Sequence, residues 1–301
     1  MEYDGRLNDY VRELHAAGTS YTGLVLKLAV EEGYALPMAV RIVDTVLRND
    51  GSGTLSYDPP QVSRRLPAID TSSKQAVLHL SGADVAVTFE QLAPRIVVLD
   101  NLLSSDECDA LCDEALPAFA PARVVDEGEQ TVHAAHLRSN DSAQLPAARS
   151  ALVRRIEARI EQLTGWPTAC CETLQVQRYA QGQQYQPHYD FFDGNSEAHD
   201  AAQAHGGQRL ATLILYLKAP EAGGATYFAN LGMRIAPRKG GALFFTYPDP
   251  GNNSGTLHGG EAVLAGEKWI ATLWFRERAW RHTQAGAAVT SAAVQSQAAA
   301  K

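Results

Sequence analysis

The chain has few cysteines, no long apolar run and no excess of basic residues, and each shortage excludes a class of protein. Four cysteines among 301 residues are too few for the disulfide framework of a small secreted domain. No stretch approaches the ~20 consecutive apolar residues of a membrane-spanning helix, so we expect no membrane partner. Lys and Arg number 26 against 34 Asp and Glu, a net charge of −8, which argues against a nucleic-acid binder that relies on a basic face.

The cysteines also lack the spacing of a zinc site. Cys108 and Cys112 are four residues apart in a helix-like stretch, and Cys170 and Cys171 are adjacent, which favours buried free thiols. The first residues carry neither the basic nor the apolar segment of a secretory signal, so we expect a reducing, cytoplasmic location. The composition that remains, 45% hydrophobic and 20% charged residues, is that of a globular protein.

The composition changes along the chain and predicts four regions. Residues 1–50 carry helical patterns over 24–30 and 37–50, and they form an N-terminal helical region that could pack on the next domain, present a substrate, mediate dimerisation or shield a sheet edge. Residues 51–74 are rich in Gly, Ser, Pro and Asp and predict a linker. Residues 75–282 form the main domain, and residues 283–301, with a single charge and no aromatic residue, predict a flexible tail.

Helix signals come first in the main domain, and short strands dominate after them. Ser104 to Glu107 has the capping pattern of a helix start, and a longer helix is predicted over 146–163. Strands divided by Gly, Pro and Asn are predicted over residues 95–100, 173–179, 210–217, 242–247 and 269–276. This order predicts an α+β fold, with an antiparallel sandwich or barrel that carries helices on one side.

The segment that carries chemistry ends in His188 and Asp190. In extended backbone, residues two apart point to the same face, so an imidazole and a carboxylate are offered together to a divalent metal. A third neutral ligand, for which His258 is the best candidate, would complete the facial triad of non-haem Fe(II) oxygenases. A pair of this spacing is common by chance, and on its own it is no more than a surface pair.

Lys268 adds context, because it stands at the start of an apolar strand ten residues after His258. A buried ammonium is costly unless it is paired, and the far carboxylate of a dicarboxylate cosubstrate would satisfy it. The alternative is a strand-end lysine that extends to water.

With these residues in their order, the sequence resembles the prolyl 4-hydroxylase-type branch of the 2-oxoglutarate/Fe(II)-dependent dioxygenases. The likeness covers about residues 94–278, as several blocks in the right order. These blocks are residues 94–108, 138–140, 178–190, 209–217, 223–226, 239–240 and 258–274.

The resemblance implies a double-stranded β-helix (jelly-roll) core with supporting helices, and it assigns roles residue by residue. The matched positions are His188, Asp190 and His258 as iron ligands, Lys268 for the distal carboxylate of 2-oxoglutarate, Tyr179 and Thr226 as its hydrogen-bonding partners, and Arg138, Tyr185, Arg209 and Trp274 along a peptide-substrate groove.

The activity implied is that of a procollagen-proline 4-dioxygenase-like hydroxylase. It would use Fe(II), 2-oxoglutarate and O2, with ascorbate as a possible reductant, to hydroxylate a prolyl residue in a peptide or protein and release succinate and CO2. One alternative is an enzyme that hydroxylates a free amino acid or small metabolite. A second alternative is a non-catalytic jelly-roll binding protein. A metal-storing cupin would leave Lys268 and Thr226 without a role. The oligomeric state stays open.

Three departures from the family pattern concern the substrate. Gly240 and Gly241 stand where relatives often have Gly-Asp, Arg276 replaces another polar residue, and residues 193–208 look like a loop insertion. Insertions of this kind tend to govern substrate choice. Apolar strand residues are candidates for dry walls of the cavity or for ordinary core, namely Leu213, Leu215, Phe244 and Leu273.

Overall fold

The computed structural model describes residues 5–32, 39, 42–43, 46–47, 65–72, 76–121, 139–147, 149–192, 205–248 and 254–280. Its helices are α1 (Gly5–Ala16), α2 (Tyr21–Leu26), the π-helix η1 (Lys27–Glu31), α4 (Ser105–Ala115), η2 (Leu116–Ala118), α6 (Ala151–Thr164), η3 (Thr168–Cys170) and η4 (Ala229–Leu231). Its strands are β1 (Val77–Leu80), β2 (Ala83–Gln91), β3 (Ile96–Asp100), β4 (Ala120–Pro121), β5 (Asp141–Leu145), β6 (Leu174–Tyr179), β7 (Tyr185–His188), β8 (Arg209–Lys218), β9 (Ala222–Gly223), β10 (Thr226–Phe228), β11 (Met233–Ile235), β12 (Ala242–Thr246), β13 (His258–Gly260), β14 (Val263–Ala265) and β15 (Lys268–Arg276).

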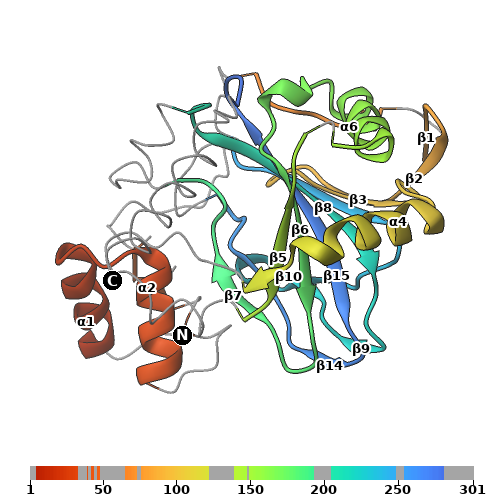
Figure 1. The fold of residues 1–301 in the computed structure, drawn as a ribbon. Helices are drawn as coiled ribbons and strands as arrows, with labels where there is room; N and C mark the ends of the chain where they lie inside the picture. Colours follow the sequence, from red (N-terminus) through yellow and green to blue (C-terminus); the bar gives the residue numbers. More distant parts are fainter. Residues whose placement is uncertain are drawn as a thin grey trace, which may run out of the picture.

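Two antiparallel sheets form the body of the protein (Figure 1). The larger sheet has nine strands in the order β1-β2-β3-β12-β8-β15-β6-β5-β4, and the smaller has four in the order β11-β10-β13-β7. The strands β14 and β9 pair separately. The α+β fold with a double-sheet jelly-roll core and supporting helices is therefore confirmed.

Side chains on the two faces of the central strands belong to two different hydrophobic cores. In β8, Ile214 and Tyr216 pack between the sheets, whereas Leu213 and Leu215 face the helices. Successive side chains of a strand point to opposite faces, so neither leucine can line a cavity between the sheets. The same holds for the other two candidates, so the core interpretation is right for all of Leu213, Leu215, Phe244 and Leu273.

Helices α4 and α6 cover the outer face of the nine-stranded sheet (Figure 1). Ser104 caps α4 in a capping box with Glu107, as the sequence predicts. The second helix begins at Ala151 and not at residue 146, because Ser150 is the N-cap and accepts a hydrogen bond from the Val153 amide. The two helices are joined by Glu107, whose carboxylate accepts hydrogen bonds from buried Arg159 at 2.7 and 3.0 Å.

The N-terminal helices lie beside the smaller sheet, at the end where β7 is found (Figure 1). Part of the predicted linker is well packed: Ile69 is buried in the main core, and the Ala68 amide donates to the Thr164 carbonyl. The predicted tail over 283–301 and most of the helix predicted over 37–50 lie outside the described residues.

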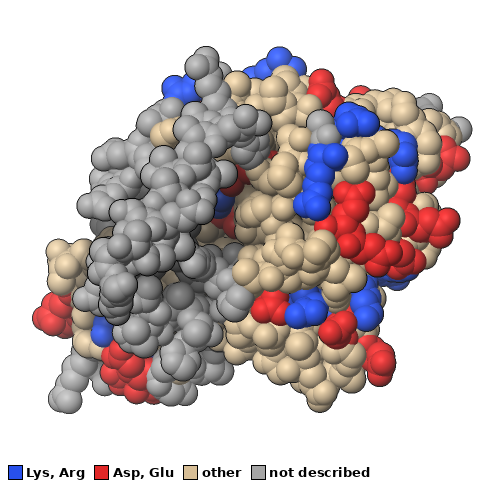
Figure 2. Space-filling view, viewed as in Figure 1, with Lys and Arg blue, Asp and Glu red and all other residues tan. Residues whose placement is uncertain are grey.

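Acidic and basic residues mix on the face that carries α4 and α6, as Figure 2 shows. Among the described helices, none has both the length and the apolar character that a membrane crossing needs. The four cysteines are free thiols, as predicted, but only Cys108 and Cys171 are buried, and Cys112 and Cys170 are partly exposed.

Candidate active site

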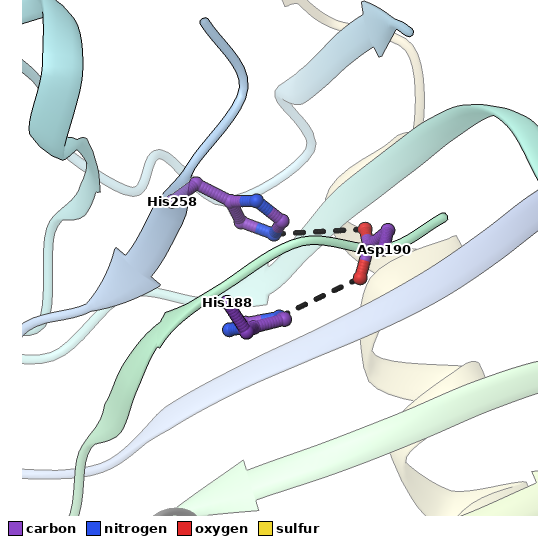
Figure 3. Close-up of side chains that lie close together, drawn as sticks. All are labelled: His188, Asp190 and His258. Atoms are coloured by element: carbon purple, nitrogen blue, oxygen red, sulfur yellow. Dashed lines mark ion pairs between the residues drawn. The ribbon is translucent and has the colours of Figure 1, made fainter. Parts of the chain in front are cut away.

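Three side chains converge where two strands of the smaller sheet meet (Figure 3). His188 ends β7, Asp190 follows two residues later, and His258 begins β13 directly opposite His188 in the ladder. The Nε2 atoms of His188 and His258 lie 3.5 and 3.6 Å from the two carboxylate oxygens of Asp190. The predicted spacing therefore places both members of the His-x-Asp pair on one face, and the strand pairing adds the third group.

Both imidazoles are fixed in the tautomer that a metal requires. The Nδ1–H of His188 donates to the Gln186 carbonyl at 2.9 Å, and that of His258 donates to the Thr256 carbonyl at 3.0 Å. A carbonyl oxygen only accepts, so the proton resides on Nδ1 and the lone pair on Nε2 faces Asp190.

The carboxylate of Asp190 is also held in place. Its Oδ2 accepts a 2.6 Å hydrogen bond from the Thr212 hydroxyl, which lies 3.0 Å from the Tyr247 hydroxyl. Burial acts to raise the pKa of Asp190, but the neighbouring His258 and His188 outweigh it and keep the pKa below its usual range. Burial lowers the pKa of His258 to about 4, so the imidazole is neutral at physiological pH.

This donor set fits a divalent metal ion. Two neutral imidazole nitrogens and one carboxylate, all within 4.8 Å of one another, have the composition of the 2-His-1-carboxylate triad that holds Fe(II) with coordination positions left open.

Lys268 lines the same cavity as the three candidate ligands. Lys268 is only 2% exposed, so its side chain does not extend to water. Within the described part of the chain, its ammonium makes no ion pair and no hydrogen bond, and the nearest aromatic ring, that of Tyr179, is 5.5 Å away. Burial lowers its pKa to about 8, although the negative charge of Glu261 opposes this shift. A buried cation without a partner beside an open cavity fits an anionic ligand.

The two predicted neighbours of Lys268 also line this cavity. The Tyr179 hydroxyl donates to the Gln177 side chain at 2.8 Å, and Thr226 accepts a 3.0 Å hydrogen bond from the Tyr216 hydroxyl. Gly260 leaves room here: a Cβ built on it would lie 3.9 Å from the Lys268 Nζ.

Two of the predicted substrate residues lie at the wall of the cavity. The Tyr185 ring stacks on His188 with centroids 3.7 Å apart. Trp274 is partly exposed, and its indole N–H has no acceptor among the described residues. Arg138 lies outside the described residues, so its role stays a prediction.

Arg209 lies behind this wall. Its guanidinium forms a bidentate pair with Glu172 at 2.6 and 2.9 Å, donates to the Asp190 carbonyl at 3.1 Å and lies 4.2 Å from the Trp274 ring. Arg276 donates to the same Glu172 at 2.7 Å. The structure thus shows Arg209 supporting the backbone of a candidate ligand, and a contact with substrate stays a prediction.

Sequence reasoning gave no role to three polar residues of the site: Glu172, Gln177 and Thr212. Thr212 occupies an inward position of β8, where Ile214 and Tyr216 follow, and a polar residue at such a position was the available signal. Gln177 lies on the inward face of β6. Glu172 precedes β6 and shows no comparable local pattern.

Comparison with known proteins agrees with this geometry. Residues 174–276 match the profile of the 2OG-Fe(II) oxygenase superfamily. The chain is 33% identical over 232 residues to probable prolyl 4-hydroxylase 10 of Arabidopsis thaliana, which covers 68% of this chain and 78% of that protein. It is 37% identical over 188 residues to the prolyl 4-hydroxylase subunit alpha-1 of Gallus gallus, covering 62% of this chain. That match spans only 36% of the chicken subunit.

Among solved structures, the viral collagen prolyl hydroxylase of Paramecium bursaria Chlorella virus-1, in its 2OG complex, is 30% identical with a TM-score of 0.46. The alignment covers 60% of this chain and 94% of that one. The sequence relationships and the His-Asp-His geometry lead to one assignment: the chain belongs to the 2OG-Fe(II) oxygenase superfamily, as a prolyl 4-hydroxylase-like member.

Proposed function

We propose that this protein is an Fe(II)- and 2-oxoglutarate-dependent dioxygenase that hydroxylates a prolyl residue in a peptide or protein. The observation that carries the proposal is the presence, in one cavity, of the three candidate ligands and a buried Lys268 that has no ion-pair partner among the described residues. A metal triad alone would serve many reactions, whereas the added cation selects a dicarboxylate cosubstrate.

Each group has a definite task in this reaction. His188, Asp190 and His258 would hold the iron, and Lys268, with Tyr179 and Thr226 nearby, would hold the distal carboxylate of 2-oxoglutarate. When bound, iron and cosubstrate supply the oxidation of a C–H bond by dioxygen, coupled to release of succinate and CO2. The protein supplies orientation, and the apolar side chains Ile214 and Ile270 keep water from the cavity floor.

A peptide substrate is favoured because the cavity is open beside Tyr185 and Trp274, and because relatives named as prolyl 4-hydroxylases cover most of the oxygenase region. The two aromatic rings form a wall suited to a pyrrolidine ring, which packs well on flat apolar surfaces. Hydroxylation of a small amino acid or metabolite is the competing activity.

The test is turnover of 2-oxoglutarate to succinate with Fe(II) and a library of proline-containing peptides, followed by mass spectrometry for one added oxygen on proline. Stimulation by peptides and not by free amino acids supports the proposal. Stimulation by small molecules alone contradicts the peptide assignment, and succinate formation that survives in His188→Ala contradicts the site itself. Ascorbate dependence is measured in the same assay.

A further inference from the structure

The N-terminal helices pack on the back of the candidate metal site. A separate apolar cluster joins buried residues of these helices, among them Val11, Tyr21 and Leu24, to a small patch of the oxygenase body. That patch consists of Tyr189, Ala229 and Leu257. Figure 1 shows α1 and α2 on the side of the molecule where β7 lies.

The residues of this patch are the chain neighbours of the metal ligands. Tyr189 lies between His188 and Asp190, and Leu257 directly precedes His258. The ligand side chains face the cavity, while Tyr189 and Leu257 belong to the N-terminal cluster on the opposite side. Each ligand segment is therefore held between the cavity and the helices.

Direct contacts carry this coupling. The Tyr21 ring lies 5.9 Å from the Tyr189 ring, and the Tyr21 hydroxyl donates to the Asn230 side chain at 3.4 Å. Ala229, the neighbour of Asn230, donates its amide to the Leu257 carbonyl at 2.9 Å. Tyr21 thus contacts the His188–Asp190 segment through Tyr189, and it is linked to the His258 segment indirectly, through Asn230, Ala229 and Leu257.

The strands themselves fix this site weakly. β7 is an edge strand of the smaller sheet, and its ladder with β13 has only two aligned positions, with a register shift between them. A metal site needs its ligands held within about 0.5 Å, so two aligned positions leave much of that precision to the packing behind the strands.

We propose that the N-terminal helices are a positioning element for the metal ligands, acting through Tyr21 on Tyr189 and through the shared cluster on Leu257. This inference rests on the proposed function, because it assumes that the triad binds a metal. It assigns the helical region a role in metal affinity beyond its contribution to stability.

The experiment measures Mn(II) affinity and the visible absorption spectrum of the Co(II)-loaded protein, using the full chain. Tyr21→Ala, which removes the ring beside Tyr189, is expected to weaken Mn(II) binding by about 10- to 100-fold, the range for groups that orient metal ligands, and to change the Co(II) spectrum. Tyr21→Phe, which keeps the ring, is expected to restore affinity to within about twofold of the wild type.

Leu111→Ala is the matched control, because Leu111 is fully buried in α4 and belongs to the other core. It should lower the melting temperature and leave Mn(II) affinity unchanged. A folded Tyr21→Ala protein with wild-type affinity and an unchanged Co(II) spectrum overturns the inference.

A second measurement needs no variant and so survives a failure of Tyr21→Ala to fold. Coupling is reciprocal, so saturating Mn(II) must slow hydrogen exchange of the amides of α2 in the wild type. If Mn(II) binds and the hydrogen exchange of α2 does not change, the inference is wrong, although the metal site itself is confirmed. If the wild type and His188→Ala both fail to bind Mn(II), the proposed function itself is wrong.

Discussion

Thr212 donates its hydroxyl to Oδ2 of Asp190 at 2.6 Å, the carboxylate oxygen that faces the Nε2 of His258. The bond fixes the position of Oδ2, and the other carboxylate oxygen, Oδ1, faces the Nε2 of His188. Such a partner orients a ligand before any metal arrives.

The first prediction concerns this bond. Thr212→Val keeps the shape of the side chain and removes the hydroxyl, so we expect Mn(II) or Fe(II) affinity to fall by about 10- to 100-fold. Isothermal titration with Mn(II) checks it. Tyr247→Phe, one step further along the chain of hydroxyls, should have a smaller effect, and an equal loss in both variants would contradict the assignment to Thr212.

The second prediction concerns pH and Lys268. Its pKa is lowered to about 8, so in the protein without cosubstrate the ammonium predominates below pH 8 and the neutral amine above it. A carboxylate binds the ammonium, so we expect 2-oxoglutarate affinity to be nearly full at pH 7, to fall as pH rises through 8, and to be about tenfold weaker at pH 9 than at pH 7. Binding titrations across this range measure it.

Lys268→Arg serves as the control for that titration. The guanidinium stays charged at all these pH values, so its affinity, whatever its level at pH 7, should not fall further towards pH 9. A parallel decline in both proteins would assign the pH effect to another group.

The third prediction compares two adjacent glycines of β13. A Cβ on Gly259 would lie 2.7 Å from the Tyr227 hydroxyl and 2.8 Å from the Tyr185 carbonyl, so Gly259→Ala should force β13 and β7 apart and abolish metal binding. A Cβ on Gly260 would lie no closer than 3.8 Å to any atom apart from its chain neighbours, and the Lys268 Nζ would be 3.9 Å from it. Gly260→Ala should therefore keep its stability and metal affinity and raise the KM for 2-oxoglutarate. Melting curves and kinetics separate the two, and equal melting temperatures would refute the distinction.

The fourth prediction concerns acid stability. Hydrogen bonds from Arg159, from the Ser104 amide and from Arg155 outweigh the effect of burial and lower the pKa of Glu107 from 4.5 to about 2. The unfolded chain binds the extra proton between these values, so the contribution of Glu107 is complete above pH 4.5 and is lost as pH falls towards 2. Glu107→Gln should lower the free energy of unfolding by roughly 3 kcal/mol at neutral pH, because it leaves Arg159 buried without its charge partner. It should also reduce the loss of stability between pH 4.5 and pH 2.

Urea unfolding at several pH values measures the effect of Glu107→Gln. Asp109→Asn is the control, since its pair with Lys239 lies at the surface and contributes at most about 1 kcal/mol. A similar loss in both variants would mean that burial of the pair has no consequence.

The long strands of the fold were predictable because each is a nearly continuous apolar run that is buried along almost its whole length. The strand predicted over 210–217 is observed as Arg209–Lys218, and the one over 269–276 as Lys268–Arg276. Strands of three residues, such as β10 and β13, are too short to show an apolar run in the sequence, yet they supply Thr226, His258, Gly259 and Gly260 to the cavity.

The site was predictable only in part for a related reason. His188 and Asp190 are two residues apart, and that spacing has a geometric meaning in a strand. Glu172 and Arg209 are 37 residues apart, and only the completed sheet brings them together. The burial of Tyr21 against Tyr189 depends likewise on contacts between distant segments.

The bidentate pair between Arg209 and Glu172 has a consequence for selectivity. Three of the five N–H groups of this guanidinium are engaged within the protein, by Glu172 and by the Asp190 carbonyl. A peptide substrate, as proposed, would therefore meet at this wall the aromatic rings of Tyr185 and Trp274, backed by a cation already engaged by Glu172. Such a surface discriminates by ring shape more than by net charge, so acidic and basic residues flanking a target proline should be accepted alike here.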